Sequence, residues 1–214
     1  MNDIGNFHRA SADDIKALAA FSPATLHEAM GQRGAMPCCI KPIYPGMKVA
    51  GSALTVRCKP GDNLAIHRAL YAAKPGDVLV VATRGGIEWG YWGEILNEAA
   101  MALGLGGLVI DGGVRDTHVL AEQSFPVFSN GVCIRGTLKG IAPYALGRPI
   151  AIGDVVIRPG DLVVGDRDGV LVLPPEAVDL AVEKGRQREA DEAEKIAKLR
   201  AGARTLELYG LGEG

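Results

Sequence analysis

The sequence predicts an α/β protein, and three observations support this class. Runs rich in valine, leucine and isoleucine, each about as long as one strand, recur between residues 49 and 129. Segments with helical spacing lie between these runs. Pro-Gly-Asp turns precede hydrophobic strands at Pro75 and again at Pro159. Strands that alternate with helices in this way are typical of α/β folds.

The expected elements follow in chain order. Residues 11–30 have helical spacing, but Pro23 interrupts it, so a second helix is expected to begin near Ala24. Four strands are then expected, at residues 49–58, 77–83, 107–110 and 126–129. Helices are expected between them, at residues 62–73, 93–104 and 115–123. The sequence Asp-Gly-Gly-Val at residues 111–114 indicates a turn between the third strand and the next helix.

The pattern changes near the C-terminal end. Residues 151–174 contain three short apolar runs separated by Gly-Asp turns, which predicts a β-meander. Residues 176–201 are charged with a sparse apolar stripe, which predicts a long helix on a surface or across a neighbouring subunit. The sequence LELYGL that follows is expected to fold back as an apolar tail. We therefore expect one α/β domain at residues 1–175 and a C-terminal helix and tail at residues 176–214.

The composition argues against several classes of function. The formal net charge of -2 gives no electrostatic reason to expect nucleic acid or an anionic membrane as a partner. The four cysteines form no Cys-x-x-Cys pair and no apolar signal segment precedes them, so a reducing cytoplasm is the expected compartment. IDGGVRD lacks the spacing of a dinucleotide-binding glycine motif, so no nicotinamide cofactor is expected.

The strongest chemical signal joins Glu94 to an Arg-Asp pair, Arg115 and Asp116. Twenty residues separate Glu94 from Arg115, which is the length of one helix and one strand. Ligands of open α/β sheets bind at the carboxyl ends of strands, where helix N-termini converge. Both ends of this unit are therefore expected to meet at one site.

The residue types at this site suit an oxo-acid and a hard cation. An arginine offers planar donors to a carboxylate or enolate, and an aspartate suits a cation such as Mg²⁺. The amides of Ile95 and Leu96, in the first helical turn, are expected to be free for a small carboxylate. A simple Arg-Asp ion pair at a helix start is the alternative interpretation from the residues alone.

The segment WGEILNEAAMALGLGGLVIDGGVRD resembles the signature of the class II pyruvate aldolases that cleave 4-hydroxy-4-methyl-2-oxoglutarate and 4-carboxy-4-hydroxy-2-oxoadipate. In that family a carboxylate, twenty residues and an Arg-Asp pair form the motif. Similarity extends over most of the chain, through ATLHEAMGQRGAM, GDNLAIHRAL, FPVFSNG, CIRGTLKG, RPGDLVVGDRDGV and LRAGARTLELYGL. The first motif position is often aspartate in the family, whereas this chain has Glu94.

The resemblance implies a role for each motif residue. Asp116 is implied to bind a divalent cation, Mg²⁺ or Mn²⁺, and Glu94 to anchor the waters coordinated to it. Arg115 is implied to hold the keto and enolate oxygens of pyruvate. The pyruvyl carboxylate is implied to bind the backbone amides at Gly93, Ile95 and Leu96. Oxaloacetate decarboxylation is expected as a side activity, because it gives the same enolate.

The resemblance also implies the fold and the assembly. The fold is implied to be a ββα sandwich resembling the swivelling phosphohistidine domain, with a long C-terminal helix. The assembly is implied to be a homotrimer or homohexamer in which a glutamate of the C-terminal helix reaches a neighbour's site. Glu192 is the best-aligned candidate for that glutamate, and Glu189 is the alternative; a solvated helical face explains either equally well.

Two other functions stay open at this point. Relatives called regulators of ribonuclease activity share the fold and the Arg-Asp pair but act by binding an RNA-degrading enzyme. They generally lack the upstream carboxylate, so Glu94 favours the aldolase. The second alternative is a dedicated oxaloacetate decarboxylase with the same metal site.

Further candidates are weaker. His67 is expected to be a packed or interface histidine rather than a metal ligand. His118 follows Arg115 on the same helical face and is a minor candidate. At most one of the adjacent pair His27 and Glu28 is expected to face a ligand. Three aromatic residues are expected to wall the substrate cavity or to lie at an interface: Trp89, Tyr91 and Trp92.

Overall fold

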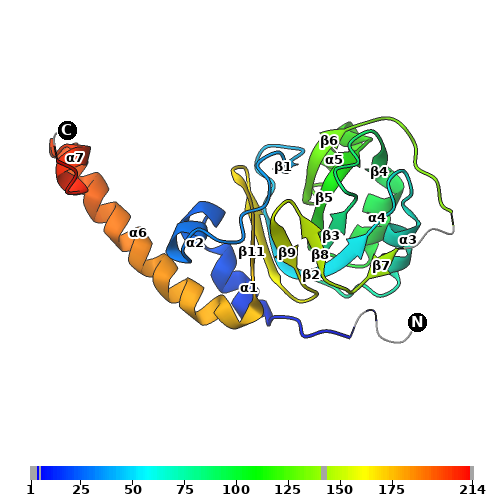
Figure 1. The fold of residues 1–214 in the computed structure, drawn as a ribbon, viewed down its shortest axis with the longest axis horizontal. Coiled ribbons are helices and arrows are strands. Elements are labelled where there is room, and N and C mark those ends of the chain that lie inside the picture. Colours follow the sequence, from blue (N-terminus) through cyan, green and yellow to red (C-terminus); the bar gives the residue numbers. More distant parts are fainter. Residues whose placement is uncertain (1–3, 5, 141–143, 213–214) are drawn as a thin grey trace.

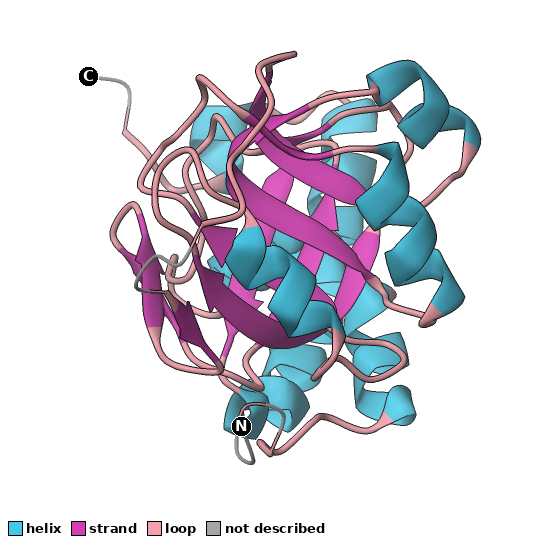
Figure 2. Ribbon diagram, turned by 90° about the vertical axis from the view of Figure 1, so that its right-hand side faces the viewer, coloured by secondary structure: helices cyan, strands magenta, loops and turns pink. Residues whose placement is uncertain are grey.

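The computed structural model describes residues 4, 6–140 and 144–212. Within these residues a nine-stranded sheet forms the centre of the molecule, and its main path has the order β1-β6-β5-β3-β2-β10-β11. Helices lie against the sheet in the view of Figure 2, and one long helix extends from the body in Figure 1. The α/β class, the sandwich architecture and the long C-terminal helix predicted from the sequence are confirmed.

The middle of the sheet is parallel and deeply buried. Its four parallel strands are β2 (Val49–Arg57), β3 (Val78–Ala82), β5 (Gly107–Val114) and β6 (Val127–Val132). The connecting helices are α3 (Leu64–Leu70), α4 (Glu94–Ala102) and α5 (Thr117–Glu122). Strands covered on both faces read as near-continuous apolar runs, which is why these strands were visible in the sequence.

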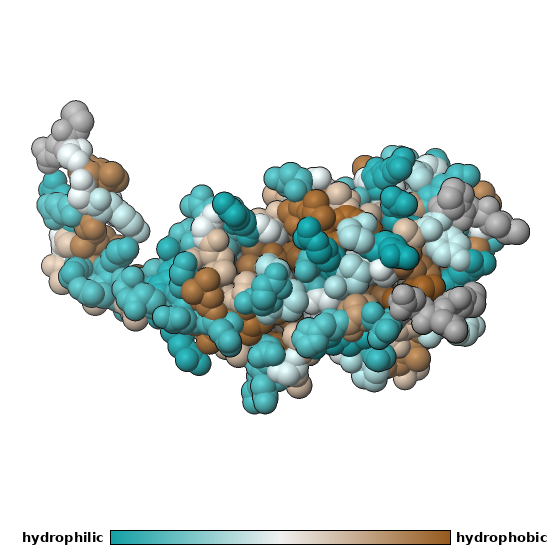
Figure 3. Space-filling view, turned by 60° about the horizontal axis from the view of Figure 1, so that its bottom comes forward, coloured by the Kyte–Doolittle hydropathy of each residue, from teal (hydrophilic) through white to brown (hydrophobic). Residues whose placement is uncertain are grey.

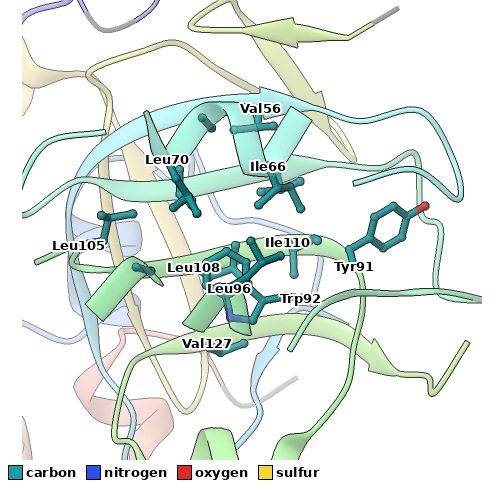
Figure 4. Close-up of a cluster of buried hydrophobic side chains, with 14 of the residues drawn as sticks. Val56, Ile66, Leu70, Tyr91, Trp92, Leu96, Leu105, Leu108, Ile110 and Val127 are labelled. Atoms are coloured by element: carbon teal, nitrogen blue, oxygen red, sulfur yellow. The ribbon is translucent and has the colours of Figure 1, made fainter. Parts of the chain in front are cut away.

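The core under α3 and α4 contains large side chains. Figure 4 shows Trp92 among Leu96, Leu108 and Ile110, whereas the hydroxyl of Tyr91 points away from this cluster. The Trp92 ring stacks on Phe125 with the ring centroids 6.2 Å apart. Trp92 therefore belongs to the core, and the expectation that it walls a cavity or an interface is wrong.

Antiparallel strands extend the sheet until it nearly closes. β10 (Leu162–Asp166) and β11 (Gly169–Leu173) continue it beyond β2, and β1 (Lys41–Pro42) pairs with β6 at the other edge. Between β11 and β1, the amide of Met36 donates to the Val170 carbonyl at 2.9 Å and the Val172 amide donates to the Gly34 carbonyl at 2.9 Å. The chain before β1 thus bridges the remaining gap.

A third layer covers the outer face of β10 and β11. It consists of α1 (Ala12–Ala19), α2 (Pro23–Ala29) and the first turns of α6 (Val178–Arg200), which follows a short 3₁₀ turn at Pro175–Ala177. Pro23 occupies the first turn of α2, where a missing amide hydrogen is harmless. The predicted break between the two N-terminal helices is therefore confirmed.

The rest of α6 forms an arm with α7 (Thr205–Leu208) at its end. The buried residues of α6 all lie in its first turns: Val178, Ala181 and Gly185. Figures 1 and 3 show the arm projecting from the body, mostly hydrophilic but with hydrophobic atoms near its end. Tyr209 is 62% exposed, and Leu206 and Leu211 are exposed too. LELYGL does turn back at the end of α6, where Lys195 Nζ lies 5.0 Å from the Tyr209 ring centroid, but in the single chain its apolar side chains stay exposed.

Two further predictions are wrong: the turn at residues 111–114 and the three-stranded meander at residues 151–174. Residues 111–114 are not a turn, because β5 continues through Val114 and pairs there with β4 (Gly90–Trp92). The glycines permit close approach rather than chain reversal: a Cβ on Gly113 would lie 2.7 Å from the Trp89 carbonyl oxygen. Strand β4 and the short β7 (Ala145–Leu146) were not predicted.

The predicted three-stranded meander is instead two hairpins. β8 (Ile150–Ile152) and β9 (Val155–Ile157) pair only with each other, and β10 and β11 belong to the main sheet. The isoleucines of the first hairpin pack into the core against the main sheet. No helix among the described residues is long and apolar enough to cross a membrane.

Candidate functional site

The residues of the predicted motif converge at one edge of the sheet. Arg115 and Asp116 follow the end of β5, and Glu94 begins α4 directly after β4. Because β4 and β5 are parallel neighbours, their carboxyl ends lie together, and the Arg115 amide donates to the Trp92 carbonyl at 2.8 Å. The prediction that the start of α4 lies beside the Arg115–Asp116 pair is therefore confirmed.

Asp116 connects the two ends. Its Oδ2 accepts a hydrogen bond from the Glu94 amide at 3.1 Å and lies 3.4 Å from the Arg115 Nε. Its backbone is left-handed, with a φ of 57°, which costs a non-glycine residue about 1–2 kcal/mol. In the described part of the chain the other carboxylate oxygen, Oδ1, has no partner, and the side chain is 39% exposed.

Gly93 makes room for this contact. An ideal Cβ at Gly93 would overlap Oδ2 of Asp116 and would lie 3.0 Å from Cγ and 3.1 Å from Nε of Arg115. The φ of Gly93 is −162°, an extended conformation that any residue adopts. Glycine is therefore needed here for space and not for backbone freedom.

A cavity of about 120 Å³ adjoins Arg115 and the start of α4. Its lining comes from α3, β4, α4, β5 and the loop after β6: Asn63, His67, Gly90, Tyr91, Gly93, Ile95, Leu96, Arg115, Gly136, Thr137 and Lys139. Two of these residues carry a fixed positive charge and none is a carboxylate. The Ile95 and Leu96 amides, at the start of α4, have no acceptor within the described residues. An anionic ligand suits such a lining.

The loop at residues 133–140 is anchored from both sides. The Gly90 amide donates to the Arg135 carbonyl at 2.8 Å. On the α3 side, the buried Asp62 accepts from the Gly140 amide at 2.6 Å, and the Asn63 amide donates to the Leu138 carbonyl at 3.1 Å. These bonds fix the segment that carries Thr137 and Lys139 at the cavity.

Burial shifts the pKa values of two side chains, His67 and Cys58. Burial and then the Lys139 charge lower the pKa of His67. Burial, with the Asp62 charge second, raises the pKa of the Cys58 thiol to about 12. A thiol with such a pKa is not a nucleophile at neutral pH.

Asp111 is a structural carboxylate rather than part of the site. It is buried, and its Oδ1 accepts from the Thr83 amide while Oδ2 accepts from the Gly85 amide at 3.1 Å. The residue therefore holds the loop after β3 against β5. This explains why the apolar strand continues into an aspartate.

The remaining predicted residues fall into two groups. His67 and Tyr91 line the cavity, whereas His118 is exposed and lies 3.4 Å from Glu122. Glu192 lies on the arm, 2.8 Å from Arg188, and neither it nor Glu189 lines the cavity of its own chain. Sequence reasoning missed several of the cavity residues because they come from distant segments: Asn63, Thr137 and Lys139.

The metal-binding side chains near Asp116 suit a cation that keeps several of its waters. The described residues contain no cluster of three or more histidine, cysteine, aspartate or glutamate side chains that could hold a metal. Asp116 and Glu94 are the motif residues that offer carboxylate oxygens here, since Asp111 and Asp62 already accept hydrogen bonds from backbone amides. A Mg²⁺-like ion fits this pattern because it binds through one or two carboxylates and keeps several waters. A closed zinc site does not fit.

Comparisons with known proteins place this geometry in a family. Residues 23–172 match the model of the RraA-like family, described as Aldolase/RraA. A protein of Halalkalibacterium halodurans named "Putative 4-hydroxy-4-methyl-2-oxoglutarate aldolase" is 35% identical over 185 residues, which cover 86% of this chain and 87% of that protein.

Solved structures agree with this placement. Streptomyces coelicolor RraAS2, called an unusual member of the RNase ES inhibitor RraA family, matches with a TM-score of 0.77 and 29% identity over 90% of this chain and 100% of its own. The RNA-processing inhibitor RraA of Thermus thermophilis matches with a TM-score of 0.64 and 27% identity, covering 71% and 92%. The chain belongs to the RraA-like family, which includes aldolases and RraA proteins.

Proposed function

We propose that this protein is a divalent-cation-dependent pyruvate aldolase, a carbon-carbon lyase. Its proposed substrates are 4-hydroxy-4-methyl-2-oxoglutarate or 4-carboxy-4-hydroxy-2-oxoadipate, which give pyruvate with a second pyruvate or with oxaloacetate. The observation that carries the proposal is the contact of Asp116 with both Arg115 and the start of α4, beside a cavity without carboxylates. The relative named for this aldolase activity supports it.

Asp116 and Glu94 are the residues that would hold the cation, Mg²⁺ or Mn²⁺. When bound, such a cation supplies Lewis acidity that stabilises negative charge on the pyruvyl oxygen. Oδ2 of Asp116 accepts from the Glu94 amide, and this bond orients Oδ1 before a cation binds. In this proposal Glu94 acts through water rather than by direct ligation.

Arg115 and the start of α4 bind the pyruvyl end. The Arg115 guanidinium donates to the keto oxygen of the substrate, where negative charge grows as the enolate forms. The amides at Gly93, Ile95 and Leu96 bind the carboxylate, favoured by the positive end of the α4 dipole. The Glu94 amide already donates to Asp116 and is therefore not one of these donors, whereas the Ile95 and Leu96 amides have no acceptor within the described residues.

Cleavage then needs few further groups. A water or hydroxide anchored by Glu94 would take the proton from the C4 hydroxyl. The bond between C3 and C4 then breaks, its electron pair forms the pyruvate enolate held by Arg115, and the proton taken from the hydroxyl is available to C3. Protonation of C3 releases pyruvate. Because loss of carbon dioxide from oxaloacetate produces the same enolate, the site is proposed to decarboxylate oxaloacetate too.

The catalytic unit in this proposal is residues 1–175, with residues 176–214 as a separate C-terminal helix and tail. The first turns of α6 pack on their own chain, and the exposed remainder of residues 176–214 packs on a neighbouring subunit of a homotrimer or homohexamer. Exposed apolar side chains along the arm support this assembly: Ile196, Leu199, Leu206, Tyr209 and Leu211. Glu192, or Glu189, would then reach the neighbour's site. In the single chain Glu192 pairs with Arg188, which also pairs with Glu28.

The similarity to RraA structures supports a second candidate, a regulator that binds a ribonuclease. One experiment separates the two functions. The first assay measures pyruvate release from both aldol substrates and from oxaloacetate. The second assay measures whether the protein inhibits a ribonuclease E-type enzyme. Aldol cleavage without ribonuclease inhibition supports the aldolase. Decarboxylation of oxaloacetate alone makes the protein a decarboxylase, and ribonuclease inhibition alone supports the regulator.

A further inference from the structure

Pro-Gly-Asp turns occur three times in this chain, each after a basic residue, at residues 59–62, 74–77 and 158–161. In each turn the aspartate amide donates to the carbonyl of the basic residue, at 3.0 Å, 3.0 Å and 3.1 Å in chain order. The glycine has a φ of 78°, 84° or 90°, as a type II turn requires at its third position. The three aspartates therefore share one local backbone geometry, and the partners of their carboxylates can be compared directly.

Two of these aspartates use both carboxylate oxygens. Asp62 accepts a backbone amide at each oxygen, at 2.8 Å and 2.6 Å. Asp77 accepts from the Lys74 amide at 2.8 Å, and the Arg9 guanidinium binds both of its oxygens, at 2.6 Å and 2.9 Å. The Asp77 side chain is 1% exposed, so Arg9 supplies the opposite charge that a buried carboxylate needs. The fold thus pairs the Asp77 carboxylate with a cation.

The third aspartate, Asp161, has one oxygen without a partner. The residue is 6% exposed, and its Oδ2 accepts from the Arg158 amide at 2.7 Å, as Asp77 accepts from Lys74. No hydrogen bond or ion pair within the described part of the chain reaches Oδ1. Burial raises the pKa of the Asp161 carboxyl, and a cation beside Oδ1 would stabilise its charged form. Asp161 is therefore prepared for a cationic group that its own chain does not supply.

Asp161 lines a cavity of about 800 Å³. Small-molecule sites usually have volumes of about 300–1,000 Å³. The walls of this cavity come from the end of α2, the loop after it, the β8–β9 hairpin and the end of β11 (Figure 1). None of these residues lines the cavity beside Arg115. A ligand in the cavity at Asp161 would therefore occupy a second site, outside the candidate functional site.

The charges around this cavity are of both signs. Asp161 lies beside the buried residues Val172 and Leu173. The other polar side chains of the lining are more exposed: His27, Gln32, Arg33, Asp154 and Arg158. A ligand that is only a cation would be repelled by the two arginines, and a ligand that is only an anion would leave Asp161 unpaired. A zwitterion satisfies both requirements.

We propose that this cavity binds an α-amino acid with a large apolar side chain. Its α-ammonium group donates to Oδ1 of Asp161. Its α-carboxylate accepts hydrogen bonds from the guanidinium groups of Arg33 and Arg158. Its side chain packs on the apolar part of the lining: Met30, Val155, Val172 and Leu173. This inference is independent of the proposed aldolase function.

The test measures binding of three related probes to the full-length protein by isothermal titration calorimetry. L-phenylalanine has both charges, 3-phenylpropanoate lacks the ammonium group, and 2-phenylethylamine lacks the carboxylate. We expect a Kd for L-phenylalanine near or below about 1 mM, an ordinary affinity for a ligand of this size. We expect 3-phenylpropanoate to bind at least about tenfold more weakly, since it loses a hydrogen bond to a charged group.

Substitution of Asp161 separates the two charges of the ligand. Asp161→Asn keeps an acceptor for the Arg158 amide but removes the carboxylate charge. We expect it to raise the Kd of L-phenylalanine by about tenfold to a hundredfold and to leave the Kd of 3-phenylpropanoate within about twofold. Arg33→Met removes an exposed charge, so we expect a rise of only about twofold to fivefold for L-phenylalanine.

Two controls isolate the role of the carboxylate at Asp161. Asp168→Asn makes the same change at an exposed aspartate that does not line the cavity, and we expect the wild-type Kd. Thermal unfolding without ligand reports whether each variant is folded.

Three results would overturn the inference. The first is a wild-type protein that gives neither heat nor a rise in Tm with millimolar L-phenylalanine, L-leucine or L-methionine. The second is equal binding of the three phenyl probes, which shows that the site recognises only the apolar group. The third is an unchanged Kd in folded Asp161→Asn, which places the ligand elsewhere. None of these results bears on pyruvate release, because no residue of the candidate functional site is changed.

Discussion

Replacing Gly93 with alanine adds one methyl group where the two ends of the site meet. The new Cβ would overlap Oδ2 of Asp116 and would lie 3.0 Å from Cγ of Arg115. Because Gly93 has an extended backbone with a φ of −162°, alanine fits the local conformation without strain. The substitution therefore acts on the position of the Asp116 carboxylate and hardly on the fold.

The size of the effect follows from this overlap. The Asp116 carboxylate has to move by about 1 Å to restore an ordinary van der Waals separation. The movement breaks its 3.1 Å hydrogen bond from the Glu94 amide and shifts the proposed cation ligand. A displacement of about 1 Å in a catalytic site costs roughly 10²-fold in rate. The lost hydrogen bond lowers the free energy of unfolding by only about 1 kcal/mol.

The assay measures kcat for pyruvate release from 4-hydroxy-4-methyl-2-oxoglutarate, and urea unfolding measures stability. Gly131→Ala is the matched control, since a Cβ there would lie 3.9 Å from the Ile87 side chain and outside the site. We expect the control to keep the wild-type kcat. If Gly93→Ala keeps kcat within about twofold of wild type, the proposed role of this contact in positioning the carboxylate is refuted.

Three other perturbations have defined outcomes. Asp111→Ala leaves the buried Thr83 amide and the partly buried Gly85 amide without their acceptor and should lower the free energy of urea unfolding by about 2–4 kcal/mol; a loss under about 0.5 kcal/mol contradicts the structural role. Burial and Lys139 lower the pKa of His67, so below about pH 6.5 the unfolded chain binds a proton that the folded chain does not. The wild type should therefore lose stability relative to His67→Gln as the pH falls through that window, and parallel stability curves contradict this. Deleting residues 187–214 removes the exposed arm and should lower the oligomer mass in light scattering, whereas an unchanged mass excludes the arm from assembly.

Much of the site could be predicted because its residues are linked through one local unit. Glu94 and Arg115 are separated by a helix and a strand, and a parallel connection returns both ends to one edge of the sheet. The helix and strand periodicities were strong because both elements pack against the core. The convergence of Glu94, Arg115 and Asp116 therefore follows from local sequence alone.

The rest depended on contacts between distant segments. Asn63 and Lys139 line the same cavity because hydrogen bonds join the start of α3 to the loop after β6, and local periodicity does not encode those bonds. The glycines at residues 112 and 113 resemble a turn in sequence, but they allow β4 and Tyr91 to approach β5 closely. Turn propensity was overridden by tertiary packing at this position.

The most direct test of the central claim is pyruvate release by wild-type protein and by Asp116→Asn, each with excess Mg²⁺ and with EDTA. Asparagine keeps the size of the side chain but removes the charge that a hard cation requires. We predict rapid release only by the wild type with Mg²⁺, and a loss of at least about a hundredfold in the other three conditions. Equal release by wild type and Asp116→Asn, or release that EDTA does not lower, would contradict a cation-dependent aldolase centred on Asp116.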